Sequence, residues 1–198
     1  SQGTLAKNAY LGFFFNETFT EFDNATDAIK HFDLNYIGLD MNVERGGNNQ
    51  KKFILKPKGR NYSSFELRHA SSGIQTTAPL IAMMNYYAQA FDFKLAQKRS
   101  IIDLLFEKNL TTQYRPEMEL TDVPKYVHIH IEEPELSLDP TSQIQMLNEI
   151  IRLAFYSKVD SREIGLVLAT HSPYIINSLN LLMKAHDCKT DIDGAHVG

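Results

Sequence analysis

Two carboxylates stand together where an apolar segment ends. Glu132 and Glu133 follow residues 126–131, in which β-branched residues alternate with histidines, and Pro134 comes directly after them. Proline lacks the N–H needed to continue a strand, so the strand is expected to stop here. This places paired acids at the carboxyl edge of a sheet, where α/β folds bind ligands. The alternative is a strand that leads into a solvated acidic turn.

A second polar group follows the next apolar segment. Residues 164–169 are continuously apolar, as strands of a parallel sheet covered on both faces are, and they lead to His171. Between the two segments, Asp139 and Pro140 predict an N-cap and a first helical position. Strand, helix, strand and helix predict a right-handed parallel unit that brings Glu133 and His171 to one edge. The predicted buried stripe of the intervening helix is Ile144, Leu147, Ile151, Ala154 and Phe155.

Small polar residues precede a third pattern, which is helical. Ser71 or Ser72 is the expected N-cap, Gly73 permits close approach, and Pro79 is expected near the first turn. Free N–H groups at a helix start, with serine hydroxyls beside them, form an anion site. A well-capped structural helix is the alternative. Its predicted core face is Leu80, Ile81, Met84, Tyr87, Ala88 and Phe91.

The remaining segments complete the expected fold. Residues 1–35 are expected to be a mostly helical lead-in, with Asn24 as the cap of a helix that carries Ala28, Ile29 and Phe32. Residues 36–56 predict a β-hairpin that turns at residues 46–49. The two glycines in this turn are not followed by Gly-Lys-Ser/Thr, which argues against a phosphate loop. Residues 94–125 predict a helix with a solvated basic face and then a loop.

The composition is that of an ordinary globular domain. The chain has 198 residues, of which 43% are hydrophobic and 22% charged, and we expect one domain over residues 1–198. A net charge of -4 argues against a strongly basic nucleic-acid surface. Cys188 is the single cysteine, which fits a reducing compartment. The apolar run at residues 10–15 is too short for a membrane span, and we expect a cytoplasmic protein.

Taken together, the three polar groups resemble motifs of ABC-type ATPases. Residues 70–75, 131–140 and 168–173 are similar to the signature, Walker B/D-loop and H-loop motifs, in the family's order. The similarity is greatest to the non-transporter branch, which includes structural-maintenance-of-chromosomes proteins, RecF-like proteins and the OLD ATPases of phage defence. It covers roughly residues 36–183. It implies the α/β C-terminal lobe of a P-loop NTPase, with parallel strands flanked by helices and an N-terminal β-hairpin.

The resemblance assigns catalytic and metal-supporting roles to the strand ends. Glu133 matches the catalytic glutamate that orients and deprotonates the attacking water. Glu132 matches the Walker B acid that supports Mg²⁺, although the family usually has Asp there. His171 matches the switch histidine that senses the γ-phosphate of ATP. Such a set suits phosphoryl transfer, which needs positioning and charge stabilisation.

The resemblance also assigns nucleotide-binding roles. Ser72 and Gly73, together with Ser71 and Gln75, match the signature residues that reach the γ-phosphate bound on the opposite protomer. Asp139 matches the D-loop acid at the dimer interface. A homodimer with ATP sandwiched between the protomers is therefore implied.

Two departures from the family define the implied partners. The gap between Gln75 and Val127 is longer than in compact transporter ATPases, which predicts an inserted helix and loop. No Gly-x-x-x-x-Gly-Lys-Ser/Thr sequence occurs in the 198 residues. We therefore expect the C-terminal lobe of a larger ATPase, inactive by itself, with an N-terminal Walker A lobe as partner. A role in DNA repair or phage defence, with DNA contacted through other domains and no membrane contact, rests on the resemblance alone.

Two other functions remain open at this stage. The chain could be a non-catalytic dimerisation or interaction module that keeps the same surfaces with a degenerate nucleotide site. Alternatively, His128, His130 and Glu132 share one strand face and could hold a transition metal, although hydrogen-bonded histidines are the commoner case.

Overall fold

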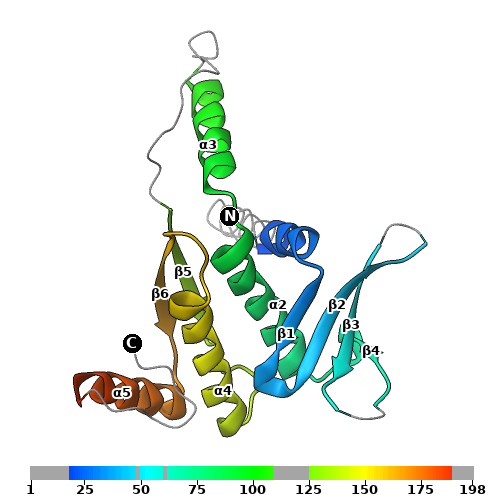
Figure 1. Cartoon of the computed structure of the whole chain (residues 1–198), viewed down its shortest axis with the longest axis vertical. Helices are drawn as coiled ribbons and strands as arrows, with labels where there is room; N and C mark the ends of the chain where they lie inside the picture. Colours follow the sequence, from blue (N-terminus) through cyan, green and yellow to red (C-terminus); the bar gives the residue numbers. More distant parts are fainter. Residues whose placement is uncertain (1–17, 48–49, 60–61, 109–124, 189–198) are drawn as a thin grey trace, which may run out of the picture.

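The structure, a computed structural model, describes residues 18–47, 50–59, 62–108 and 125–188 (Figure 1). Its first element is a helix over residues 18–28. The elements that follow are β1 (His31–Leu34), the 3-10 turn η1 (Asn35–Ile37), β2 (Leu39–Arg45), β3 (Lys51–Pro57), β4 (Phe65–Glu66), the 3-10 turn η2 (Leu67–His69), α2 (Ser72–Asn85), the π-helical turn η3 (Tyr86–Ala90), α3 (Phe93–Glu107), β5 (Tyr126–Glu132), α4 (Pro140–Ile151), the π-helical turn η5 (Arg152–Tyr156), β6 (Glu163–Ala169) and α5 (Pro173–Cys188).

The described strands form two separate sheets, and the fold is mixed α/β. The expected hairpin is confirmed as β2 and β3, and β1 and β4 extend it to a four-stranded antiparallel sheet of order β1-β2-β3-β4. The second sheet consists of β5 and β6, which run parallel as predicted, from Tyr126 opposite Glu163 to Glu132 opposite Ala169. The carboxyl ends of both strands therefore meet at one edge.

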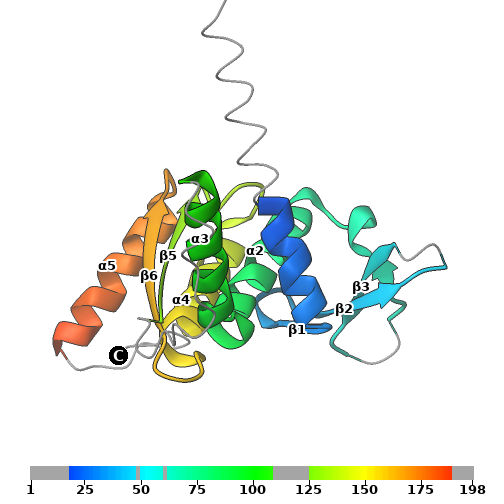
Figure 2. The same ribbon diagram turned by 90° about the horizontal axis from the view of Figure 1, so that it is seen from above.

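One hydrophobic core connects the two sheets. Helices α2 and α4 lie between them, and α5 lies beyond the parallel pair (Figure 2). Buried residues from both sheets, α2, α4 and η5 belong to the same cluster. They include Phe32, Met41, Leu55, Ile81, Met84, Ile131, Leu147, Ile150, Leu153 and Ile164. Burial of such side chains stabilises the fold by about 1.5–3 kcal/mol each, before the opposing entropy is counted.

Several predictions about the first two helical segments are wrong. Asn24 lies inside the helix over residues 18–28 rather than capping it, and Phe32 is a buried residue of β1. Pro79 lies inside α2, because this helix begins at Ser72. Pro79 therefore cannot donate the helical hydrogen bond to the carbonyl of Gln75.

The predicted stripe of α4 is partly wrong. Leu147 and Ala154 are fully buried as expected, but Ile144 and Phe155 are 37% and 47% exposed. The prediction that β6 is covered on both faces is also wrong for the described residues, because Val167 is 47% exposed. The parallel pair is covered mainly on the face that carries Ile131 and Ile164.

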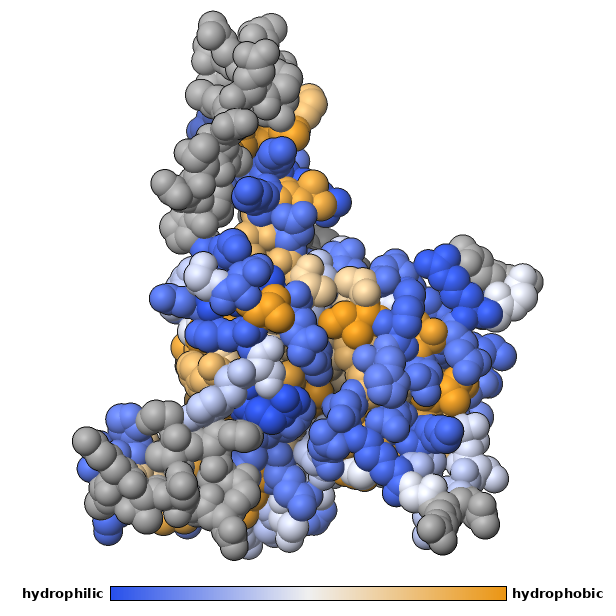
Figure 3. Space-filling model, viewed as in Figure 1, coloured by the Kyte–Doolittle hydropathy of each residue, from blue (hydrophilic) through white to orange (hydrophobic). Residues whose placement is uncertain are grey.

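Helix α3 projects from the body of the molecule (Figure 1). Hydrophobic residues are visible on its surface in Figure 3, and Leu95, Leu104 and Phe106 are all exposed. The helix expected within residues 94–125 is thus confirmed, while most of the loop expected after it lies outside the described residues. Within the described ranges, no helix combines the length and the apolar character that crossing a membrane requires.

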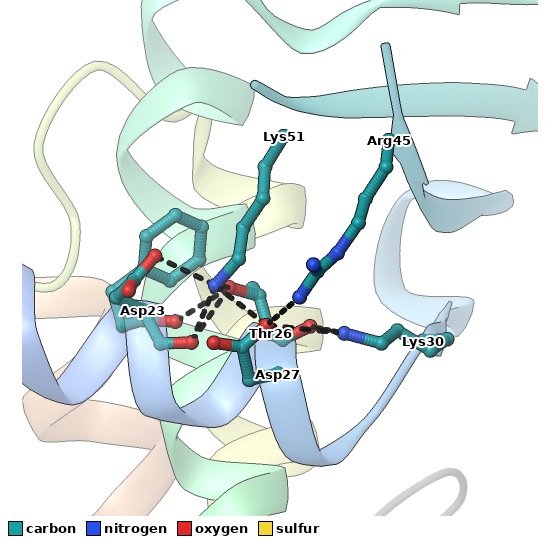
Figure 4. Close-up of polar contacts among 7 residues, drawn as sticks. Asp23, Thr26, Asp27, Lys30, Arg45 and Lys51 are labelled. Carbon is teal, nitrogen blue, oxygen red and sulfur yellow. Dashed lines mark hydrogen bonds and ion pairs between the residues drawn. The ribbon is translucent and has the colours of Figure 1, made fainter. Parts of the chain in front are cut away.

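A charge cluster fixes the first helix to the antiparallel sheet (Figure 4). Its members are Asp23, Thr26, Asp27, Lys30, Arg45 and Lys51. Lys51 of β3 contacts the Asp23 carboxylate at 2.6 Å and the Asp27 carboxylate at 3.1 Å. Arg45 of β2 contacts Asp27 at 3.1 Å. Charged side chains from two strands thus converge on one helical turn.

Candidate functional site

The strand-end site comprises Glu132, Glu133 and His171. The Glu133 N–H donates to the carbonyl of Ala169 at 2.8 Å, which extends the pairing of β5 with β6 by one residue. The carboxylate of Glu133 then lies 3.7 Å from Nε2 of His171. Both side chains are accessible, with 46% of Glu133 and 89% of His171 exposed. The predicted meeting of these residues at one sheet edge is confirmed.

The turn after β5 has an unusual backbone. Glu133 has a φ of 46° and Ser137 a φ of 61°, both in the left-handed region. Left-handed geometry costs a non-glycine residue roughly 1–2 kcal/mol. Such conformations concentrate at functional sites, where the surrounding structure enforces them. The backbone here directs the Glu133 side chain away from the direction that a continuing strand would give it.

Glu132 ends β5 with an exposed side chain on the same face as His128 and His130. Among the described residues, it takes part in no ion pair. No group of three or more His, Cys, Asp or Glu residues in the described ranges could hold a metal ion. The transition-metal alternative is therefore not supported, and His128 instead contacts the Tyr126 hydroxyl through Nε2.

The signature-like segment starts α2. Of the two expected N-cap residues, Ser71 is the one that the structure shows, but its side chain makes no capping hydrogen bond. Ser72 is exposed at the first helical position. Gln75 folds back, and its side-chain nitrogen donates to the carbonyls of Arg68 at 3.1 Å and Ala70 at 2.8 Å. Gln75 thus holds the chain that enters the helix.

Gly73 is buried against the turn that follows β5. A Cβ at this position would lie 2.5 Å from the carbonyl oxygen of Ser137 and 2.9 Å from Cδ2 of Leu138. Glycine is therefore required for packing within this chain. The structure brings the signature-like and D-loop-like segments together, but through a contact that the sequence does not predict.

Asp139 acts as the N-cap of α4, as predicted. Its Oδ1 accepts hydrogen bonds from the backbone N–H groups of Thr141 at 3.0 Å and Ser142 at 3.1 Å. The Ser142 hydroxyl donates to Oδ2, and this bond is the main reason that the pKa of Asp139 lies below its usual value. The carboxylate is thus engaged by its own helix, whichever further role it has.

Glu135 and Gln143 are the site residues that the sequence did not single out. Oε1 of Glu135 accepts from the N–H of His171 at 2.9 Å and of Ser172 at 3.1 Å. Burial tends to raise the pKa of Glu135, but hydrogen bonds from backbone N–H groups and from the Thr170 hydroxyl outweigh it and lower the pKa. Gln143 bonds to Leu138 on one side and to Ser172 on the other. The sequence feature that could have indicated Glu135 is its position as a third glutamate, directly after Glu-Glu-Pro. No comparable sequence feature indicates Gln143.

In comparisons with known proteins, no family model, curated protein or solved structure matches the chain.

Proposed function

We propose that this chain is part of an ABC-type ATPase of the non-transporter branch, which binds and hydrolyses ATP with Mg²⁺. The observation that carries the proposal is the Glu133–His171 pair, held 3.7 Å apart at the carboxyl ends of adjacent parallel strands. Ligands of α/β folds bind at this edge. Glu133 orients and deprotonates the attacking water, and His171 contacts the γ-phosphate.

The residues present fit a phosphate-bound Mg²⁺. Mg²⁺ in such enzymes is held by one or two carboxylates together with substrate phosphates and water, rather than by an all-protein cage. Glu132 supplies one exposed carboxylate beside Glu133. Bound Mg²⁺ supplies charge neutralisation on the phosphates. In this proposal, Glu132 supports the metal, and a Walker A lobe of the same protein holds most of the phosphate contacts.

The second nucleotide contact comes from the partner protomer. Ser72 is exposed at the start of α2 and reaches the γ-phosphate bound on the opposite copy, so the active form is a homodimer. The backbone N–H groups of the first turn add positive potential for an anion. In this proposal, ATP hydrolysis drives a DNA-repair or phage-defence effector.

A non-catalytic interaction module is the second candidate, and Gly73 favours it. The contact of Gly73 with Ser137 explains this glycine by packing alone, without a nucleotide. A large substitution at Gly73 cannot separate the two functions, because it would disturb the chain's own turn. Exposed Ser72 is the residue to change instead.

Complementation of two inactive variants tests the proposal in the protein that carries both lobes. Ser72→Arg should abolish ATP-dependent dimerisation and hydrolysis, while Glu133→Gln should dimerise with ATP and not hydrolyse it. A mixed dimer has one composite site with both residues intact, so hydrolysis should reappear on mixing. Asn180→Ala, on the exposed surface of α5, is the control. Normal hydrolysis by Ser72→Arg would overturn the role of Ser72 at a composite site, whereas absence of hydrolysis by the wild-type protein would leave the interaction module as the better function.

Calorimetry on the 198-residue chain provides a simpler check. The backbone amides and lysine of a P-loop supply most phosphate contacts, and this sequence contains no such loop. We expect Mg-ATP to bind more weakly than roughly millimolar, and a stoichiometric micromolar isotherm would contradict the proposed division between two lobes.

A further inference from the structure

One carboxylate joins the turn after β5 to the turn after β6. Glu135 and His171 are 36 positions apart in the sequence, and Oε1 of Glu135 accepts from the N–H groups of both His171 and Ser172. Hydrogen bonds to an ionised acceptor are about twice as strong as neutral ones. The contact fixes the backbone of His171, whose side chain is 89% exposed.

A second connection lies beneath the first. Gln143 of α4 donates to the carbonyl of Leu138 at 2.9 Å and accepts from the Ser172 hydroxyl at 2.5 Å. The same hydroxyl accepts from the N–H groups of Tyr174 at 3.2 Å and Ile175 at 3.3 Å, at the start of α5. Both Gln143 and Ser172 are buried, so these bonds are shielded from water.

The network continues to the signature-like helix. The Leu138 N–H donates to the carbonyl of Glu135 at 3.0 Å, which closes the turn that carries Ser137. The carbonyl of Ser137 is the group against which Gly73 packs. His171 is thus connected to the start of α2 through one short, hydrogen-bonded turn of the same chain.

We propose that Glu135 is a positioning residue that holds His171 in place and couples it to the turn packed on Gly73. This inference rests on the proposed function, because positioning matters only if His171 contacts the γ-phosphate. Glu135 touches neither nucleotide nor metal in this arrangement and acts through His171. A ligand that moves His171 would therefore also displace the Ser137 turn. Through Gly73, this displacement would reach the start of α2, which contacts the partner protomer in the proposed homodimer.

Steady-state kinetics of the protein with both lobes test the positioning role. Glu135→Ala removes both acceptor bonds and should lower kcat about 10- to 100-fold, as misplacement by about 1 Å does, with a KM for ATP within about threefold of wild type. Glu135→Gln keeps an acceptor oxygen without its charge and should fall between Ala and wild type. Glu163→Gln, at the opposite end of β6, is the matched control and should leave kcat unchanged.

Amide hydrogen exchange on the 198-residue chain gives a readout independent of ATP. Exchange at His171 should be at least about tenfold faster in Glu135→Ala than in wild type or Glu163→Gln. The Ser172 N–H should respond less, because it also donates to the Thr170 hydroxyl oxygen at 3.0 Å. If wild-type protein does not hydrolyse ATP, the proposed function fails and the positioning role falls with it, although exchange still reports the contact. If wild type is active but Glu135→Ala retains full kcat, or if exchange is unchanged, the positioning role alone is wrong. Should Glu135→Ala fail to fold, Glu135→Gln decides by the same two measurements.

Discussion

The charge cluster and the strand-end site both gather carboxylates at the surface, but they differ in what faces those carboxylates. Asp27 of the charge cluster contacts Lys30 at 3.3 Å, Arg45 at 3.1 Å and Lys51 at 3.1 Å. At the strand-end site, by contrast, Glu133 faces only the imidazole of His171, as far as the described residues show. Acids matched by fixed cations hold elements together. Acids without fixed cations are available to a cation or a water from solution.

The difference extends to the hydrogen bonds that support each region. The charge cluster uses long side chains at the surface, where salt screens their attraction and side-chain entropy opposes it. The strand-end site is supported by side chains bonded to backbone, with Gln143 and Ser172 buried. The first region should therefore respond to salt, and the second to substitutions that alter packing.

The largest expected effect is on the rate of ATP hydrolysis, which should depend on the strand-end acids and not on those of the charge cluster. In the protein with both lobes, Glu133→Gln should lower ATP hydrolysis on the order of a hundredfold or more, because glutamine keeps the shape and loses the base. Asp27→Asn should leave the rate of hydrolysis within about twofold of wild type, because Asp27 is not the general base in this proposal. A phosphate-release assay on both variants measures this. Equal rates for the two would remove the distinction between structural and catalytic acids.

The next effect is on stability. Gly73→Ala places a methyl group against the backbone carbonyl of Ser137, 2.5 Å away, so it should reduce the free energy of unfolding by about 1–3 kcal/mol. Gly47→Ala is the control, because a Cβ there meets nothing within 4 Å. Urea unfolding of the two variants and wild type supplies the numbers. An unchanged Gly73→Ala would mean that the turn moves freely and that no tight contact couples it to α2.

Acid should weaken the charge cluster. A hydrogen bond from Lys51 is the main cause that lowers the pKa of Asp27 from its ordinary value of 3.8 to about 2. A lowered folded-state pKa contributes stability that is present above pH 4 or so and is lost as the pH falls towards about 2. Over that window, the urea midpoint of wild type should fall more steeply than that of Asp27→Asn. Parallel curves would show that Asp27 is not stabilised by its cations.

Salt should produce the smallest effect. Near neutral pH, raising NaCl from about 0.05 M to about 1 M shortens the screening length several-fold. The difference in urea midpoint between wild type and Asp27→Asn should therefore become smaller. Exchange at His171 and Ser172 should not change, because these amides bond to a carboxylate directly across a short distance. A salt response at these two amides would break the contrast between the regions.

The sequence predicted the parts of the site that depend on local order along the chain. Two apolar segments with a capped helix between them were enough to predict parallel strands and to place Glu133 beside His171. The Asp139–Pro140 start of α4 was equally clear, because its partners lie within one helical turn.

The parts that failed depend on contacts between distant segments. Ala28, Ile29 and Phe32 have helical spacing, yet Phe32 belongs to a strand because pairing with β2 outweighs local preference. Glu135 bonds to backbone N–H groups, and any residue type at positions 171 and 172 other than proline could supply them, so no pattern reveals the contact. The role of Gly73 could not be foreseen either, since it depends on a turn far along the chain.

The contact at Gly73 also limits what a sequence comparison could show. The obstructing atom is the main-chain oxygen of Ser137, which every amino acid possesses, so no exchange of the side chain at position 137 would make room for a Cβ. Any protein with this turn would have to retain glycine here, whether or not it had ever met a nucleotide. Invariance of the glycine would therefore carry no information about ATP. The exposed serine beside it, which no described packing contact constrains, is the position whose variation would distinguish functional relatives from merely structural ones.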